Sequence, residues 1–274
     1  MPDAEYRRVP GLSYSGAKKL LPPSTPAHYR YEQDHPSPPK RAYDLGHAAH
    51  RMVLGAGAEL VLIDARDYRT KAAQEARDAA YDAGQTPLLP HEWAAAEAMA
   101  RAVREHPLAG RLYADGRPEV SLFWTDPETG VPLKARLDWL PNSRPGRPVL
   151  VPDLKTIAGL AHPSVLSRPI DDYRYHMQAA MYLDGLAACG LTPPEGAAFL
   201  NVFVEKEPPH LVQVVQIDHR DIELGRGLNR AAMEIWRDCT TSGVWPGYPV
   251  EIATVSLPPY ARRRHEESIT DDEF

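Results

Sequence analysis

Two acidic residues and one lysine stand close together in the middle of the sequence, on two segments with the alternating pattern of β-strands. In the segment 133–139 an apolar face alternates with a polar face, and Asp138 belongs to the polar face. In the segment 149–156, Asp153 and Lys155 share a face, because side chains two residues apart on a strand point the same way. If the two strands pair through the short loop that joins them, both carboxylates and the ammonium group meet on one surface.

A pair of carboxylates at such a place requires a compensating cation. Two unit charges about 4 Å apart repel by roughly 4 kcal/mol near a protein surface, and a divalent ion that prefers oxygen ligands, such as Mg²⁺, turns this repulsion into attraction. A metal ion held there activates water and neutralises the charge that develops on a phosphate. Lys155 would orient or help to deprotonate the water, or stabilise that charge. The plainer alternative is two exposed carboxylates with Lys155 as a salt-bridge partner, because a single D-x-K tripeptide is a weak signal.

Two predicted helices carry residues whose spacing places them on one helical face. Gly46 and His50 lie four residues apart, and so do Gln178 and Tyr182. A glycine permits close approach of another backbone, and a neutral imidazole can bind a metal ion. Taken singly, His50 is better explained as a packed helix histidine, and Gln178 and Tyr182 as an ordinary polar edge. The functional interpretation depends on their occurring together with the acidic strands.

The order of predicted elements indicates one α/β domain with a helical N-terminal part. Apolar spacing predicts the helices, and alternation predicts the strands. The expected helices cover residues 44–55, 70–84, 91–106, 171–188 and 218–239, and the expected strands cover residues 119–124, 133–139, 149–156, 198–204 and 211–217. We expect a single domain over residues 1–261, with a helical part over about 1–110, a core over about 111–261, and a charged, disordered tail over 262–274.

The composition is that of an ordinary globular protein without a membrane segment. The 274 residues are 43% hydrophobic and 25% charged. No apolar run approaches the roughly 20 residues that span a bilayer, and Met1–Pro10 lacks the apolar stretch of a signal peptide. The two cysteines, Cys189 and Cys239, indicate neither a disulfide framework nor a zinc or iron–sulfur site. We therefore expect a reduced, cytoplasmic protein.

The net charge of −6 argues against a general nucleic-acid coat protein. It is compatible with a nuclease, whose site must collect carboxylates to hold metal, because DNA can be attracted by the bound cation and by local basic groups. Phosphate contacts of this kind position DNA without reading its sequence. The candidates, each of which is equally well explained as a solubilising charge, are Lys134, Arg136, Arg144, Arg147, Arg168 and Arg174.

Four short motifs follow one another in a fixed order along the chain. They are Leu45-Gly46-(three residues)-His50, Leu137-Asp138, Asp153-Leu154-Lys155-Thr156 and Gln178-(three residues)-Tyr182. Further segments agree with them, namely Leu12-Ser13-Tyr14-Ser15, Pro26-Ala27-His28-Tyr29, Arg69-Thr70-Lys71, Glu119 and Gly243-Val-Trp-Pro-Gly247. Together these motifs resemble the RecB-like branch of the PD-(D/E)xK nucleases, particularly the phage and prophage RecE-like (exonuclease VIII) group. The resemblance extends over most of the chain.

This resemblance implies a fold and a set of metal ligands. The implied fold is a restriction-endonuclease-like core, in which helices flank a mixed β-sheet. The implied cofactor is Mg²⁺, with Mn²⁺ as a substitute, bound by Asp138, Asp153 and His50 and by the backbone carbonyl of Leu154. Glu119 would bind a second metal ion or orient a water molecule. No iron–sulfur cluster is expected, because the chain lacks the cysteine set of the iron–sulfur members.

The resemblance also implies a reaction. Lys155 would be the catalytic lysine, while Gln178 and Tyr182 would support the site or touch the DNA backbone. The implied enzyme digests linear double-stranded DNA from its 5′ ends during recombination, works as a homo-oligomer away from membranes, and leaves single strands for an annealing protein. Two alternatives stay open. One is a single-strand or branched-DNA nuclease with the same site, and the other is a DNA-binding or assembly protein without catalysis.

Overall fold

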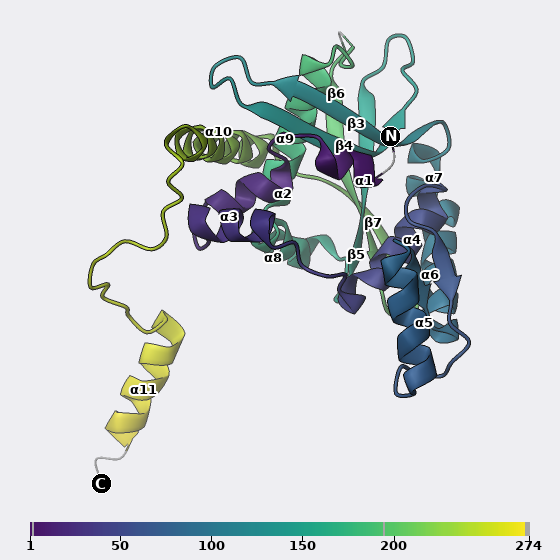
Figure 1. The fold of residues 1–274 in the computed structure, drawn as a ribbon, viewed down its shortest axis with the longest axis horizontal. Helices are drawn as coiled ribbons and strands as arrows, with labels where there is room; N and C mark the ends of the chain where they lie inside the picture. Colours follow the sequence, from purple (N-terminus) through teal and green to yellow (C-terminus); the bar gives the residue numbers. More distant parts are fainter. Residues whose placement is uncertain (2, 194, 272–274) are drawn as a thin grey trace.

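The computed structural model describes residues 1, 3–193 and 195–271, and the first part of the chain is mainly helical (Figure 1). Its helical elements are α1 (Asp3–Arg8), α2 (Tyr14–Ala17), the 3₁₀ turn η1 (Lys18–Leu20), α3 (Pro26–Asp34), the 3₁₀ turn η2 (Arg41–Tyr43), α4 (Asp44–Leu54), α5 (Lys71–Asp82), α6 (Pro90–Glu105) and α7 (Ala109–Leu112). Two short strands, β1 (Leu60–Leu62) and β2 (Thr86–Leu88), pair in parallel among them. The three helices predicted here correspond to α4, α5 and α6.

The second part of the chain supplies the central strands. In chain order its elements are β3 (Gly116–Thr125), β4 (Pro132–Pro141), β5 (Val149–Ile157), α8 (Pro163–Asp172), α9 (Tyr175–Ala188), β6 (Ala197–Glu205), β7 (Val212–Gln216) and α10 (His219–Ser242). β3 pairs antiparallel with β4, while β6 pairs parallel with β5 and antiparallel with β7. The five predicted strands are all present, and the architecture is the mixed α/β arrangement that the sequence predicted.

The expectation that β4 and β5 pair directly was wrong in its detail. The strands form two sheets, β3–β4 and β5–β6–β7, and no backbone ladder joins β4 to β5, both of which are fully described. Backbone N–H groups alternate between the two sides of a strand. On the β4 side of β5, Pro152 has no N–H to donate, and the Leu154 N–H donates to the Asp138 carboxylate instead of to a carbonyl. A side chain therefore replaces the ladder at this point.

The long helix predicted over about residues 171–188 is present as α9 from Tyr175 to Ala188, but its predicted start is wrong, because a separate helix, α8, ends just before it. α8 ends at Asp172 and α9 begins at Tyr175. Between them, Arg174 adopts a left-handed backbone conformation with a φ of 57°, which ends one helix and turns the chain before the next. The apolar spacing continues across this break, so periodicity alone does not reveal it.

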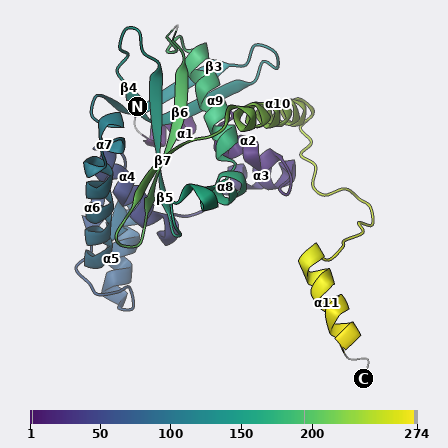
Figure 2. The same cartoon turned by 180° about the vertical axis from the view of Figure 1, so that it is seen from behind.

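β6 separates two packed layers of the core. Its residues Leu200, Val202 and Val204 pack in a cluster with residues of α4 and α6. On the opposite face, Phe199 and Phe203 pack with residues of α8 and α9. Figures 1 and 2 show this arrangement from two sides, with α4 and α6 on one side of the strands and α8, α9 and α10 on the other. The central strands are thus covered on both faces, as expected for a parallel pair.

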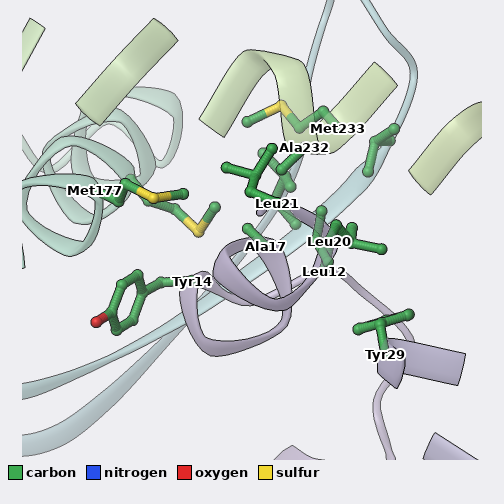
Figure 3. Close-up of a cluster of buried hydrophobic side chains, with 12 residues drawn as sticks. Leu12, Tyr14, Ala17, Leu20, Leu21, Tyr29, Met177, Ala232 and Met233 are labelled. Carbon is green, nitrogen blue, oxygen red and sulfur yellow. The ribbon is translucent and has the colours of Figure 1, made fainter. Parts of the chain in front are cut away.

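The N-terminal segment completes the core on the α9 and α10 side. Ser13 caps α2 by accepting from the Gly16 N–H. The short helical turn that follows packs against Met177 of α9 and Met233 of α10, as Figure 3 shows. The N-terminus of the chain is therefore built into the same core as the late helices, which links sequence segments more than two hundred residues apart.

The disordered tail predicted for residues 262–274 is contradicted over most of its length. Helix α11 (Pro259–Asp271) begins with a proline at its first position, which is favourable there, and its Ala, Arg and Glu residues favour helix. Figures 1 and 2 show that this helix stands apart from the other elements. Residues 272–274 lie outside the described part of the chain.

The crossing of α9 and α10 depends on one glycine. A Cβ atom at Gly225 of α10 would lie 2.6 Å from the carbonyl carbon of His176 and 2.8 Å from the backbone nitrogen of Met177. Neither atom can move without displacing the start of α9. Gly227, on the same helix, has no atom near the position of its Cβ. α10 has 24 residues, but none of the described helices is both long enough and apolar enough to cross a bilayer.

We predict that Gly225→Ala destabilises the protein by about 2–3 kcal/mol, the cost of overpacking a close contact. Gly227→Ala is the matched control, and we expect it to stabilise the protein by up to about 1 kcal/mol, because alanine is the better helix former. Urea unfolding followed by circular dichroism measures both. Equal midpoints for Gly225→Ala and the parent protein would show that the two helices do not touch here.

Candidate active site

Helix α4 carries His50 to the central strands. The helix ends at Gly55, which takes a left-handed φ of 71°. A Cβ atom at Gly46 would lie 3.2 Å from Thr156 Oγ1, so this glycine lets α4 lie directly on β5. One turn later, His50 Nε2 lies 3.1 Å from Asp138 Oδ1. The close approach expected at Gly46 is present.

The Asp138 carboxylate joins three elements. One oxygen, Oδ1, contacts His50 of α4, and the other, Oδ2, accepts a 2.8 Å hydrogen bond from the Leu154 N–H of β5. Burial by itself raises the pKa of Asp138, but the charge and hydrogen bond of His50, aided by Lys155 and the Leu154 N–H, hold this pKa below its usual value. Asp138 is therefore ionised at neutral pH, and it sits on β4 as the sequence predicted.

Asp153 lies in a different environment, although it is close to Asp138. Its side chain is buried on β5, where Oδ1 accepts a 2.8 Å hydrogen bond from Gln178 Nε2 and Oδ2 forms an ion pair with Lys155. Burial raises the pKa of Asp153 to about 6; Lys155 opposes this shift and Asp138 adds to it. Two neighbouring carboxylates thus have pKa values that are pushed apart, an arrangement that is enriched in active sites.

Lys155 is held as an ammonium group. Burial tends to lower the pKa of Lys155, but the charges of Asp153 and then Asp138 outweigh it, so the pKa is raised. The Nζ atom also lies 4.8 Å from the centroid of the Tyr175 ring, a favourable cation–π distance. In this arrangement Lys155 donates hydrogen bonds and does not accept a proton at neutral pH.

The two predicted residues of α9 take different positions. Gln178 is buried and contacts Asp153 directly. Tyr182 packs edge-to-face on Phe199, with ring centroids 5.4 Å apart. Burial raises the pKa of the Tyr182 phenol well above its usual value; the charge of Asp153 adds to this shift, and the side chain of Gln178 opposes it. Tyr182 thus interacts with Gln178 and packs on Phe199, close enough to Asp153 to feel its charge.

Glu119 lies across the β3–β4 pair from Asp138, between the register pairs Pro118↔Trp139 and Val120↔Leu137. It is held at a φ of 50°, a left-handed conformation that is costly for a residue with a side chain. Its carboxylate pairs with Arg136, and its charge contributes to raising the pKa of His50, after Asp138. Glu119 thus borders the site on the His50 side.

These residues could hold a divalent metal ion that keeps water molecules as its remaining ligands. Among the described residues, no three His, Cys, Asp or Glu side chains form a complete metal-binding group. However, Mg²⁺ usually binds one or two carboxylates and keeps several waters, and Asp138 and Asp153 supply such a pair. Asp153 Oδ2 is buried and receives no hydrogen bond of good geometry in the described structure. The Leu154 carbonyl points to the same side of β5 as its N–H, which is the Asp138 side.

Three of the six candidate phosphate contacts are used within the protein. The Lys134 ammonium donates to three backbone carbonyls of the N-terminal segment, those of Tyr6, Arg7 and Val9. An ammonium group has three protons, so Lys134 has none left for a phosphate. Arg136 contacts Glu119, and Arg174 donates to a backbone carbonyl of the N-terminal segment, that of Pro22. Lys134 is therefore a structural residue.

The other three candidates lie on the surface. Arg144 pairs with Asp115 at 3.2 Å, and Arg168 lies 3.5 Å from Asp172. Such exposed pairs are weak and exchange easily with other anions. Arg147 is exposed in the loop before β5. The side chains of these three arginines are thus exposed to solvent.

Sequence reasoning missed two residues next to the acids. Tyr175 lies under the Lys155 ammonium, and its position depends on the break between α8 and α9, which the sequence did not reveal. Asn201 of β6 is in register with Asp153. A signal for Asn201 was present, since it is a polar residue within the apolar run Phe199–Val204, which reads as a buried strand.

The family to which the chain belongs has a PD-(D/E)xK-like domain. The family described as "PDDEXK-like domain of unknown function (DUF3799)" matches residues 13–257, and the chain belongs to this family. The restriction-endonuclease-like core predicted from the sequence is therefore confirmed, whereas the narrower RecE-like placement is not tested by this match. None of the curated proteins matches the chain.

Comparison with solved structures agrees with the fold. A crystal structure from Eubacterium rectale, described as a "Putative exonuclease", is 13% identical and has a TM-score of 0.60, with 92% of each chain covered. At this identity the likeness shows the fold alone. A second crystal structure, of SSO0001, is 12% identical over 73% of this chain and 85% of its own, with a TM-score of 0.32, which is too low to support an argument.

We predict that Asp138→Asn lowers the pKa of His50 relative to the parent protein, because it removes the carboxylate that raises this pKa against the effect of burial. NMR titration of the His50 ring signals in metal-free protein measures the change. Glu119→Gln is the graded control, and we expect a smaller decrease, because Glu119 has a weaker effect on His50. An unchanged His50 pKa in Asp138→Asn would contradict the contact between the two side chains.

Proposed function

We propose that this protein is a metal-dependent exodeoxyribonuclease that hydrolyses phosphodiester bonds at the ends of linear double-stranded DNA. One observation carries the proposal: Asp138, Asp153 and Lys155 converge at one site, where Asp153 is buried and the other two are partly buried, with His50 and Gln178 bonded to the two acids. Buried carboxylates with separated pKa values are costly unless they hold a cation or move protons. A DNA-binding or assembly protein has no use for such a set.

The metal ligands that we propose are Asp138, Asp153 and His50, with the Leu154 carbonyl as a further ligand and Glu119 for a second ion. The cofactor is Mg²⁺, and Mn²⁺ can replace it. When bound, the ion supplies an activated water and neutralises charge on the phosphate. The chemistry of the donors supports this choice, because two carboxylates and a carbonyl are the oxygen ligands that Mg²⁺ prefers.

Lys155 acts as a cation in this proposal, and not as a base. Its raised pKa supports this role, because an ammonium group can donate to a phosphate oxygen where negative charge develops. Gln178 fixes the Asp153 carboxylate through its hydrogen bond. Tyr182 buttresses Gln178, and neither residue exchanges a proton in the reaction.

The finer assignment follows the motif resemblance to the RecE-like group. We propose digestion in the 5′-to-3′ direction during recombination, in the cytoplasm, by a homo-oligomer that hands single strands to an annealing protein. Residues 1–261 would act as a single domain. The exposed Arg144, Arg147 and Arg168 would hold the DNA backbone. The fold shared with the Eubacterium rectale protein supports the general class and leaves these details as proposals.

We predict that Asp153→Asn and Lys155→Met each reduce cleavage of linear duplex DNA by on the order of 10²–10³-fold, the usual cost of removing a charge that stabilises a transition state. End-labelled linear duplex, digested with and without Mg²⁺, is the substrate. Lys40→Met is the control, because this lysine is exposed outside the named motifs and should not affect the rate. Parent-like digestion by both site variants would end the assignment. Cleavage of covalently closed circles would instead favour an endonuclease.

Metal binding should also be visible without any reaction. We predict that Mn²⁺ raises the thermal midpoint of the parent protein, since a ligand at 100 times its Kd stabilises the folded state by about 2.7 kcal/mol. The shift should disappear in Asp138→Asn and Asp153→Asn. It should be smaller at pH 5 than at pH 7.5, because Asp153, with a pKa of about 6, is protonated at the lower pH and must lose that proton to bind a cation. A shift that is equal at both pH values and in all variants would place the metal elsewhere.

A further inference from the structure

A fully buried asparagine lies beside Asp153 on the neighbouring strand. Asn201 is in the middle of β6, with an exposed fraction of 0%. Its register partners are Asp153 on β5 and Val215 on β7, so strands cover it on both sides. The other residues of the run Phe199–Val204 are apolar and buried. An apolar side chain would suit this position better on packing grounds alone.

Asn201 faces the same layer as the catalytic acid. Alternation along β6 directs Leu200 and Val202 toward α4 and α6, so Asn201 points to the opposite side, with Phe199 and Phe203. That side faces α9, which supplies Gln178 to Asp153. The asparagine amide and the Asp153 carboxylate therefore occupy one layer between the sheet and α9.

The Asn201 amide is unpaired in the described structure. Neither Nδ2 nor Oδ1 has a hydrogen-bond partner, and Asp153 Oδ2 also lacks a hydrogen bond of good geometry. Buried polar groups in native proteins are paired with few exceptions, and an unpaired buried amide is unfavourable. The unused donor of Asn201 thus lies in register with Asp153, whose Oδ2 is held by the Lys155 ammonium.

The ion pair of Asp153 explains why a second donor is needed. Lys155 is the cation that contacts Asp153 Oδ2, yet the proposed reaction requires this ammonium at the DNA phosphate. When Lys155 turns to the phosphate, the buried Asp153 carboxylate loses this partner. The bound cation would then balance the charge of Asp153, and a hydrogen-bond donor within reach would keep its carboxylate in a fixed orientation.

We infer that Asn201 is a positioning residue for Asp153. Its Nδ2 donates to the Asp153 carboxylate when Lys155 leaves it, and Gln178 continues to hold Oδ1. Asp153 therefore keeps a fixed orientation toward the cation while Lys155 serves the phosphate. This inference rests on the proposed function, because it assigns Asn201 a role in the same metal site.

The test compares two buried asparagines, each replaced by the similar-sized leucine. Asn201→Leu should fold with equal or higher stability in urea, because it removes an unpaired amide. It should weaken Mn²⁺ binding by 10–100-fold, the usual effect of removing a group that orients a metal ligand, as measured by the electron paramagnetic resonance signal of free Mn²⁺. Asn201→Ser, which keeps a donor, should bind Mn²⁺ more tightly than Asn201→Leu.

Asn229→Leu is the matched control. Asn229 is buried on α10, and its Nδ2 donates 2.8 Å to the Met177 carbonyl. Its replacement should lower stability, because it removes a buried hydrogen bond between α10 and α9, but it should not change Mn²⁺ affinity. We therefore expect Asn201→Leu to weaken metal binding without loss of stability, and Asn229→Leu to lower stability without loss of metal binding.

The outcomes separate this inference from the proposed function. If the parent protein binds no Mn²⁺, both fail. If the parent binds Mn²⁺ and Asn201→Leu binds it equally well, the role of Asn201 is overturned and the nuclease proposal stands. If Asn201→Leu does not fold, Asn201→Ala takes its place, with Asn201→Ser as the variant that keeps a donor, and parent-like Mn²⁺ affinity in Asn201→Ala would overturn the inference.

Discussion

The Asp138 carboxylate is the interaction on which the rest of the site depends. One of its oxygens accepts the Leu154 N–H of β5, and the other contacts His50 of α4. Because β4 and β5 share no backbone ladder, this side chain is the polar link between the two sheets at the site, beside an apolar cluster that includes Leu137 and Val151. The same carboxylate thus helps to hold together two acids that belong to different sheets.

Two basic side chains offset the two acids of the site, but the two acids differ in pKa. His50 and Lys155 offset Asp138 and Asp153, and burial strengthens each of these interactions. The pKa of Asp138 stays low because His50 and a backbone N–H stabilise its charge. The pKa of Asp153 is raised because the effect of burial is larger than the opposing effect of the Lys155 charge. Asp153 is consequently the acid that gains more from a bound cation.

Local sequence patterns predicted the fold class of the chain and the proximity of the site residues. Strand alternation located Asp138, Asp153 and Lys155, and helical spacing located His50 and Gln178; the structure brings these five together, while their roles stay a prediction. Such patterns work because each of these residues lies inside a regular element, where the direction of a side chain follows from its position.

Other features could not be read in this way, because they depend on tertiary contacts. The break before α9 requires a left-handed Arg174, and nothing in its neighbours marks it. Lys134 shares a strand face with Asp138, yet its ammonium is captured by the N-terminal segment, which is distant in sequence. The proximity of Asn201 to Asp153 could not be predicted either, because it follows from the register of β5 and β6.

The most direct test of this account is the position of a bound metal ion. A crystal of the parent protein soaked in MnCl₂ and measured at the manganese absorption edge gives an anomalous peak for each bound ion. The account predicts a peak within about 2.0–2.4 Å of a carboxylate oxygen of both Asp138 and Asp153, the range for oxygen ligands of such ions. Manganese that binds in solution but gives no peak between these two acids would contradict it.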